Sequence, residues 1–153
     1  MAPQELLPLT VEVSIVIIGF AALVTTMQNV DQVMRTMRVR VIYQESSQAF
    51  VISLVVMVLL SAHISPETTW RIGSLLYLAL MPFALFRINE DRKSIQRDKW
   101  SVWFGYTVII SSMSLQLLNL YIAEFWPLVV AISISLGLSL TVFIEFFRPR
   151  PLE

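Results

Sequence analysis

The sequence predicts an all-α protein, a polytopic bundle of transmembrane helices. Hydrophobic residues make up 56% of the 153 residues and charged residues only 14%, and the mean hydropathy is +0.71. A typical soluble domain carries about 25% charged residues, and a soluble domain of this size leaves much of its surface in water. Five apolar runs approach the length of about 20 residues that a membrane span needs. We therefore expect residues 1–153 to form a single transmembrane domain with five spans.

The first run follows an N-terminus without the basic region of a cleaved signal peptide, so we expect it to be retained as a span. Ser65–Thr69 is expected to be a short loop between the second and third runs. Glu124–Trp126 separates the last two runs, and Pro127 then suits the first turn of a new helix. The predicted spans cover about residues 9–27, 48–64, 70–87, 102–123 and 127–147.

The segment Asn29–Gln48, before the second span, has its own helical pattern. Val30, Val33, Met34, Met37 and Val41 recur at helical spacing, with polar residues between them. We expect an amphipathic helix on the inner membrane surface that continues into the second span. It is either a lipid-sensing or gating helix, or a basic surface helix that fixes the topology.

The basic residues predict the orientation, because Lys and Arg in short loops stay on the cytoplasmic side. With the N-terminus outside and the C-terminus cytoplasmic, only Arg71 falls in an outer segment. All other basic residues then fall in inner segments: Arg35, Arg38, Arg40, Arg87, Arg92, Lys93, Arg97, Lys99, Arg148 and Arg150. The tryptophans agree, since Trp70 and Trp126 fall at the outer interface and Trp100 and Trp103 at the inner one.

The inner basic segments are candidates for contact with anionic lipid headgroups, to which each basic residue contributes on the order of 1 kcal/mol at the surface. The candidate residues are Arg35, Arg38, Arg40, Arg92 and Lys93. Between residues 89 and 101, neighbouring acidic residues dilute the basic charge, and the alternative there is a solvated loop or helix end.

Two spans carry candidates for a polar path. Glu12 lies about one turn into the first span, where an ionisable group is costly. It faces a helix or cavity, binding a cation or a proton, or it reaches the outer headgroups. Gly105, Ser112, Gln116 and Asn119 lie on one side of the fourth span. That face either hydrogen-bonds to other helices or lines a water-filled path.

Small residues predict helix packing, because they let helix backbones approach closely. Ala131, Ser135 and Ser139 step by four along the fifth span, and Ser133, Gly137 and Thr141 do the same beside them. Gly19 continues a similar face in the first span. Two such faces on one span suggest contacts both within and between subunits, so we expect a homo-oligomer.

Several function classes lack support. The chain has no cysteine and one histidine, so we expect no thiolate or histidine-rich metal site. It contains no phosphate-binding glycine motif and no HExxH or GxSxG motif. A net charge of zero gives no basic footprint for nucleic acid. We expect no enzymatic activity and no cofactor.

The chain resembles a widespread group of small, uncharacterised bacterial membrane proteins with four to five spans. The resemblance lies in Glu12 before Gly19-Phe20-Ala21-Ala22, in Arg38-Val39-Arg40, and in Trp70-Arg71 at the start of a later span. It covers roughly the first half of the chain, and it implies a bacterial inner membrane without implying an activity. Small multidrug transporters, a looser likeness, also carry a glutamate in their first span, but their function is not transferred because Glu12 lies near the span end.

Three functions are consistent with these features. The first is a homo-oligomeric ion channel or pore, lined by the fourth-span face or the Glu12 face. The second is a non-conducting membrane scaffold or sensor that acts through a partner protein. The third is a small proton-coupled transporter that uses Glu12. The lipid bilayer is the one partner that all three share.

Overall fold

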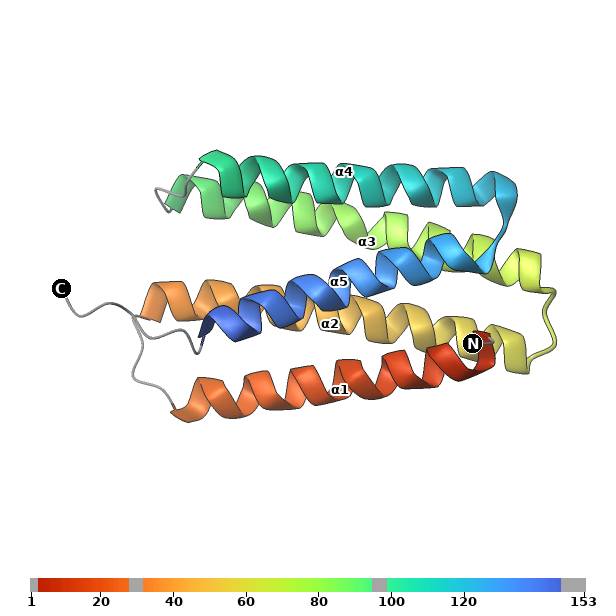
Figure 1. The fold of residues 1–153 in the computed structure, drawn as a ribbon, viewed down its shortest axis with the longest axis horizontal. Coiled ribbons are helices and arrows are strands. Elements are labelled where there is room, and N and C mark those ends of the chain that lie inside the picture. The colour runs from red at the N-terminus through yellow and green to blue at the C-terminus, as the bar shows by residue number, and fades with distance from the viewer. Residues whose placement is uncertain (1–2, 28–31, 95–98, 147–153) are drawn as a thin grey trace. The chain divides into compact units, whose positions relative to one another are not determined.

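The computed structural model describes the backbone of residues 3–27, 32–94 and 99–146, and all regular secondary structure within these ranges is helical. Five helices follow one another along the chain (Figure 1). They are α1 (Pro3–Met27), α2 (Gln32–Ser61), α3 (Pro66–Ser94), α4 (Lys99–Ile122) and α5 (Phe125–Phe146). The all-α prediction is confirmed.

Three of the described helices are long and apolar enough to cross a membrane. Their candidate spans are Glu5–Leu23 in α1, Val39–Ser61 in α2 and Phe125–Ile144 in α5. A shorter apolar segment, Tyr106–Ile122, lies in α4. The helices are therefore those of a membrane-embedded protein, and crossing by all five stays a prediction.

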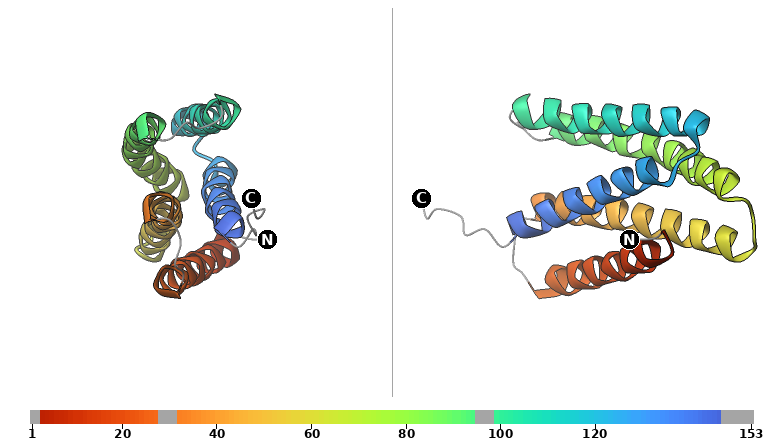
Figure 2. Two further views of the ribbon diagram at one scale, coloured as in Figure 1. Left: turned by 90° about the vertical axis from the view of Figure 1, so that its left-hand side faces the viewer. Right: turned by 45° about the vertical axis from the view of Figure 1, so that its right-hand side comes forward.

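The chain divides into two compact units. Unit 1 comprises Met1–Val51 with Ile132–Glu153, and unit 2 comprises Ile52–Ala131. Helices α2 and α5 each contribute residues to both units. In unit 2, α3 and α4 pack side by side, as the two views in Figure 2 show.

Helix α2 is longer than the predicted second span. The predicted surface helix and the span form one continuous helix from Gln32 to Ser61, which confirms their predicted continuity. The candidate span begins at Val39, nine residues before the predicted start at residue 48. This difference brings the polar run Gln44–Gln48 into the candidate span, because the apolar residues on either side of it keep the whole segment apolar.

The end of α2 is closed by two backbone hydrogen bonds. Ile64 N–H donates to Leu59 O at 3.2 Å, and His63 N–H donates to Leu60 O at 3.1 Å. This pairing is the Schellman motif, whose turn residue takes the left-handed conformation. His63 has a φ of 60°, a conformation that suits glycine better than a residue with a Cβ.

The following helix starts earlier than predicted. Ser65 is the N-cap of α3, since its Oγ accepts a hydrogen bond from Thr68 N–H at 3.4 Å and pairs with Thr68 Oγ1 at 2.8 Å. Pro66 and Glu67 then occupy the first turn, where proline and an acidic residue are favoured. The prediction of a loop over Ser65–Thr69 is therefore wrong for Pro66–Thr69, because the capping sequence starts the helix immediately.

The connection from α4 to α5 is very short. Ala123 has a φ of 52° and donates its N–H to Asn119 O at 2.9 Å, which ends α4. Helix α5 starts two residues later at Phe125, so the predicted break over Glu124–Trp126 is wrong for Phe125 and Trp126, while Pro127 lies in the first turn, as predicted.

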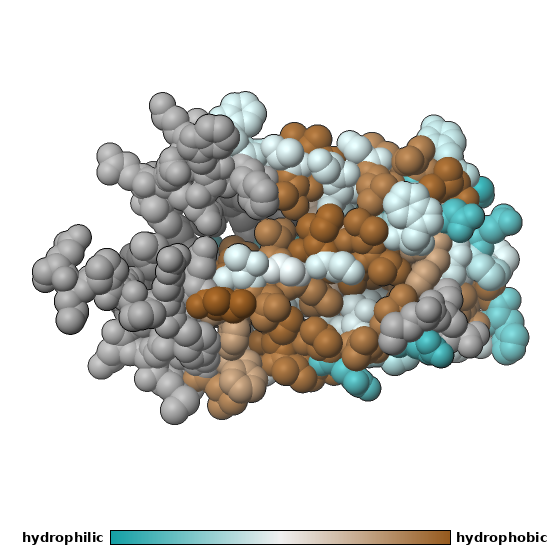
Figure 3. Space-filling model, in the orientation of Figure 1, coloured by the Kyte–Doolittle hydropathy of each residue, from teal (hydrophilic) through white to brown (hydrophobic). Residues whose placement is uncertain are grey.

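Buried residues recur every three or four positions along the helices. On α2 the buried set runs through Ile42, Glu45, Ser46, Ala49, Ile52, Ser53 and Val56. On α4 it runs through Ile109, Ser112, Gln116, Asn119 and Ala123. This spacing is that of helices packed at small crossing angles. Large apolar side chains also cover the outward faces, and Figure 3 shows them across one side of the described helices.

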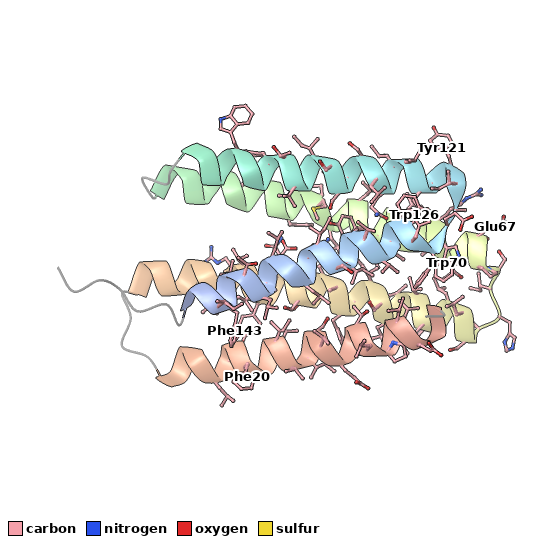
Figure 4. All side chains as sticks on the ribbon, in the orientation of Figure 1. Phe20, Glu67, Trp70, Tyr121, Trp126 and Phe143 are labelled. Carbon is pink, nitrogen blue, oxygen red and sulfur yellow. The ribbon has the colours of Figure 1, made fainter. Side chains whose placement is uncertain are left out.

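Each unit has its own packed contacts. In unit 1, Ile17, Ala21 and Ile42 form a buried cluster, and the rings of Phe20 and Phe143 meet edge to face at 6.0 Å (Figure 4). In unit 2, a Cβ placed on Gly73 would lie 2.8 Å from Leu128 Cδ2 and 3.0 Å from Val56 Cγ2. Glycine at position 73 therefore allows α3 to approach these side chains closely.

Candidate functional site

The predicted polar face of α4 forms a hydrogen-bonded network in unit 2. Gln116 and Asn119 are both 0% exposed, and both contact Ser74 of α3. Ser74 Oγ donates to Gln116 Oε1 at 2.9 Å, and Asn119 Nδ2 donates to Ser74 Oγ at 2.8 Å. Gln116 Nε2 also donates to Pro127 O at 2.8 Å, and Asn119 Oδ1 accepts from Glu124 N–H at 3.0 Å.

The two ends of this network fix its direction. Pro127 O can only accept and Glu124 N–H can only donate, so the orientation of both side-chain amides is determined. The single hydroxyl proton of Ser74 then points to Gln116, and its oxygen accepts from Asn119. The network joins α3, α4 and the start of α5, which is the helix-packing alternative for this face.

The other residues of that face differ. Ser112 is buried, and its Oγ has no hydrogen-bond partner. Gly105 lies in α4, and its exposure lies outside what the structure describes. Within the described part of the chain, the face therefore combines a closed network near the α4–α5 connection with a buried hydroxyl one turn earlier.

The predicted carboxylate of the first span does not enter the interior. Glu12 is exposed on α1, as is Gly19, and a Cβ added at Gly19 would meet nothing within 4 Å. Neither residue packs against another helix within the described chain. The exposed side chain of Glu12 favours the second reading, in which it reaches the outer headgroups, and that reading stays a prediction.

The two small-residue faces of α5 have different surroundings. Ala131, Ser135 and Ser139 are buried. Ser133 and Gly137 are exposed, and a Cβ at Gly137 would meet nothing within 4 Å. One face is thus used inside the chain, and the other points outward.

The predicted lipid-contact residues are described only in part. Arg40 is exposed on α2. The side chains of Arg35, Arg38, Arg92 and Lys93 lie outside the described residues. Contact of this set with anionic lipid stays a prediction.

One interior carboxyl group was not among the predicted site residues. Glu45 is only 8% exposed, and its Oε2 is buried without a hydrogen-bond partner. The hydroxyl group of Ser135 lies beside this carboxyl group but has no partner that meets full hydrogen-bond geometry. Glu45 was missed because the predicted second span began at residue 48.

The sequence did contain a signal for Glu45. The positions 42, 45, 49, 52 and 56 are spaced by three or four residues, and every one of them except Glu45 is apolar. Extending the apolar face of the second span backwards by two turns would have placed Glu45 on the buried side.

Glu45 belongs to a polar cluster in unit 1, which we define as Glu45, Ser46, Gln48, Ser135 and Ser139, all of them buried. Ser139 Oγ donates to Ile42 O at 3.0 Å and lies 2.8 Å from Ser46 Oγ. Because a hydroxyl has one proton, Ser46 is the donor to Ser139. Gln48 Nε2 is buried without a partner.

Among the described residues, no group of three or more His, Cys, Asp or Glu side chains could hold a metal ion. No family model, curated protein or solved structure that was compared with the chain matches it. The resemblance to small bacterial membrane proteins therefore stays a prediction.

Proposed function

We propose that this chain is a multi-pass protein of the bacterial inner (plasma) membrane, with five crossings, an outer N-terminus and a cytoplasmic C-terminus. The polarity of its described helices supports this proposal. Phe20, Leu54, Leu75 and Ile144 are among many exposed large apolar residues, whereas the buried set contains almost as many polar as apolar residues. A soluble helix has the opposite distribution.

Aromatic residues support a crossing by α4. Trp103 is 71% exposed and Tyr121 is 84% exposed, and they lie eighteen residues apart on this helix. At 1.5 Å per residue they are about 27 Å apart, close to the roughly 30 Å thickness of the hydrocarbon core. Trp126, which is exposed, lies at the Tyr121 end of unit 2 (Figure 4), as expected for an aromatic belt, whereas Trp70 at the same end is buried against Phe125.

The absence of cysteine makes the topology easy to test. In intact cells, Thr68→Cys should react with a membrane-impermeant maleimide, whereas Asp98→Cys should react only after permeabilisation. Reaction of both positions from the outside would contradict the proposed five-span topology.

We further propose that the protein moves protons or small cations across the bilayer. The observation that carries this proposal is the polar cluster of unit 1, which places a buried carboxyl group inside a candidate span. Ionisable residues in spans are costly, and where they occur they commonly mark ion paths or proton relays. The polar face of α4 is a weaker candidate for a path, since Gln116 and Asn119 are engaged in hydrogen bonds.

Flux into proteoliposomes tests this function. Purified protein would be reconstituted with an entrapped pH dye, and a potassium gradient with valinomycin would supply the driving potential. We expect dye acidification above that of protein-free vesicles, and the same assay with a sodium dye measures cation movement. No flux of either ion at any pH or voltage would favour the alternative, a non-conducting scaffold or sensor that acts through a partner protein.

The outward face of α5 supports a second copy of the chain as a partner. Ser133, Gly137 and Thr141 are exposed at steps of four residues, and Thr141 Oγ1 is satisfied by Gly137 O of its own helix at 2.8 Å. Small residues at these steps, between the exposed side chains of Val130 and Leu140, let two helices approach closely. Gly137→Leu should then reduce cross-linked oligomer, whereas Leu118→Phe, on an exposed position of α4, should not.

A further inference from the structure

The carboxyl group of Glu45 lies deep within the membrane helices of unit 1. It is six residues beyond Val39, the start of the α2 candidate span, which corresponds to about 9 Å along the helix axis. Its neighbour Ser135 is ten residues beyond Phe125, the start of the α5 candidate span, or about 15 Å from that end. Both measures place the carboxyl group inside the hydrocarbon core rather than at a headgroup level.

The charged and titratable groups around Glu45 leave it without a cationic partner among the described side chains. On its own helix, Arg40 is exposed, and the phenol of Tyr43 is partly buried against the apolar cluster of unit 1. On α1, Glu5 and Glu12 are exposed. On α5, no charged residue occurs between Phe125 and Ile144. A charged carboxylate in such surroundings is costly unless it is paired.

The hydroxyl groups near Glu45 are not equivalent. The protons of Ser46 and Ser139 are used in the Ser46–Ser139–Ile42 O chain. The Ser135 hydroxyl, beside the carboxyl group, has no other partner. Ser135 can therefore donate to a charged Glu45 or accept from a neutral one by rotating its single proton.

We propose that Glu45 is a proton-binding site inside the bilayer, with Ser135 as the residue that positions its carboxyl group. This inference rests on the proposed ion-transport function and names the ligand of the site. Uptake adds one proton to a carboxylate oxygen, which forms the O–H bond and removes the negative charge. Release breaks that O–H bond, and the proton passes to water or to a carrier base while the electron pair stays on the oxygen.

A metal cation fits the same cluster less well. A dehydrated cation needs several oxygen ligands that replace its hydration shell. Among the cluster residues Glu45 is the one acidic side chain, and the remaining oxygens are neutral hydroxyl and amide groups, of which Ser46 and Ser139 are held in the hydrogen-bond chain to Ile42 O. The proton needs one oxygen, so it is the ligand that the cluster can satisfy.

Dicyclohexylcarbodiimide, an apolar reagent that enters bilayers, tests the site directly. A protonated carboxyl group adds across one C=N bond of the reagent, and the O-acylisourea rearranges to a stable N-acylurea without a leaving group. We expect mass spectrometry of the reconstituted protein to find one whole reagent molecule on Glu45, with labelling that falls as pH is raised. Glu45→Gln should lose this label, and Glu12→Gln should keep it.

Two further measurements keep the proposal falsifiable if Glu45→Gln does not fold. Ser135→Ala should displace the pH midpoint of Glu45 labelling, whereas Ser133→Ala, exposed on the same helix, should leave it unchanged. Sodium chloride should protect Glu45 no better than choline chloride at constant pH. Labelling that is absent from Glu45, independent of pH, or blocked specifically by sodium would overturn the proposal.

The outcomes separate this inference from the function on which it rests. Labelling of Glu45 in a protein that shows no proton or sodium flux would support the site and contradict ion transport. Proton flux that survives in a folded Glu45→Gln variant would support ion transport and contradict the role of Glu45.

Discussion

Ser74 should be one of the residues of unit 2 most sensitive to a small change. Ser74→Ala removes a single oxygen atom, so it creates little empty volume, but it deletes two hydrogen bonds at once. Ser74 is 0% exposed, so water cannot readily replace the lost partner. Gln116 Oε1 and Asn119 Nδ2 would each lose a partner in a buried setting.

The magnitude follows from measured side-chain hydrogen bonds between membrane helices. These average about 0.6 kcal/mol each and reach about 1.7 kcal/mol, so two bonds give a loss of about 1 to 3 kcal/mol. Equilibrium unfolding in mixed detergent micelles, with increasing dodecyl sulfate, would measure the loss. Ser61→Ala is the matched control, because Ser61 is exposed and its hydroxyl bonds to Met57 O of its own helix; its effect should stay within about 0.5 kcal/mol.

A double-mutant cycle strengthens this test. Asn119→Ala should cost less in the Ser74→Ala background than in the wild type, by about the 0.6 to 1.7 kcal/mol of their shared bond. If the α4 face instead lined a water-filled path, water would bond to Asn119 whether or not Ser74 is present, so Asn119→Ala would cost the same in both backgrounds. Additive effects, or a Ser74→Ala cost no larger than that of Ser61→Ala, would therefore refute the packing network.

Three other substitutions have defined expected outcomes in the same unfolding assay. Gly73→Ala should destabilise by up to about 2 kcal/mol, since its Cβ would collide with Leu128 and Val56 while the gain in helix propensity of about 1 kcal/mol offsets part of that cost, and Gly19→Ala should cost nothing. His63→Gly should stabilise by about 0.5 to 1 kcal/mol by relieving a left-handed conformation, and a loss would contradict the Schellman geometry. Ser65→Ala should cost about 1 kcal/mol as a lost N-cap, and no change would contradict that role.

The fold was largely predictable because hydrophobic length alone separates helices from connections. Pro127 also indicated the first turn of α5, where its missing N–H is tolerated, although the helix starts two residues before the predicted start at residue 127. The predicted boundaries of the second and third spans were wrong, because polar residues there belong to the helices. Ser65 caps α3 through its side chain, and the apolar residues that flank Glu45 carry α2 through a polar run, so hydropathy placed both boundaries too far along the chain.

The contacts in the interior were harder to predict than the fold, because the face that a helix buries depends on which helix packs against it. The α4 pattern correctly grouped Gln116 with Asn119, but nothing in the sequence pointed to Ser74 as their common partner. Glu12 and Glu45 both interrupt apolar runs. Only the packing of α2 with α5 distinguishes them, since Glu45 lies beside Ser135 and Glu12 faces outward.

The two polar interiors differ in how fully their hydrogen bonds are satisfied. In unit 2, both functional groups of each amide have partners, so any movement of Gln116 or Asn119 breaks bonds. In unit 1, Glu45 Oε2, Gln48 Nε2 and Ser135 Oγ are buried without partners. A closed network holds helices in one arrangement, whereas an incomplete one can change its protonation without breaking bonds. We therefore expect unit 2 substitutions to change stability first, and unit 1 substitutions to change transport first.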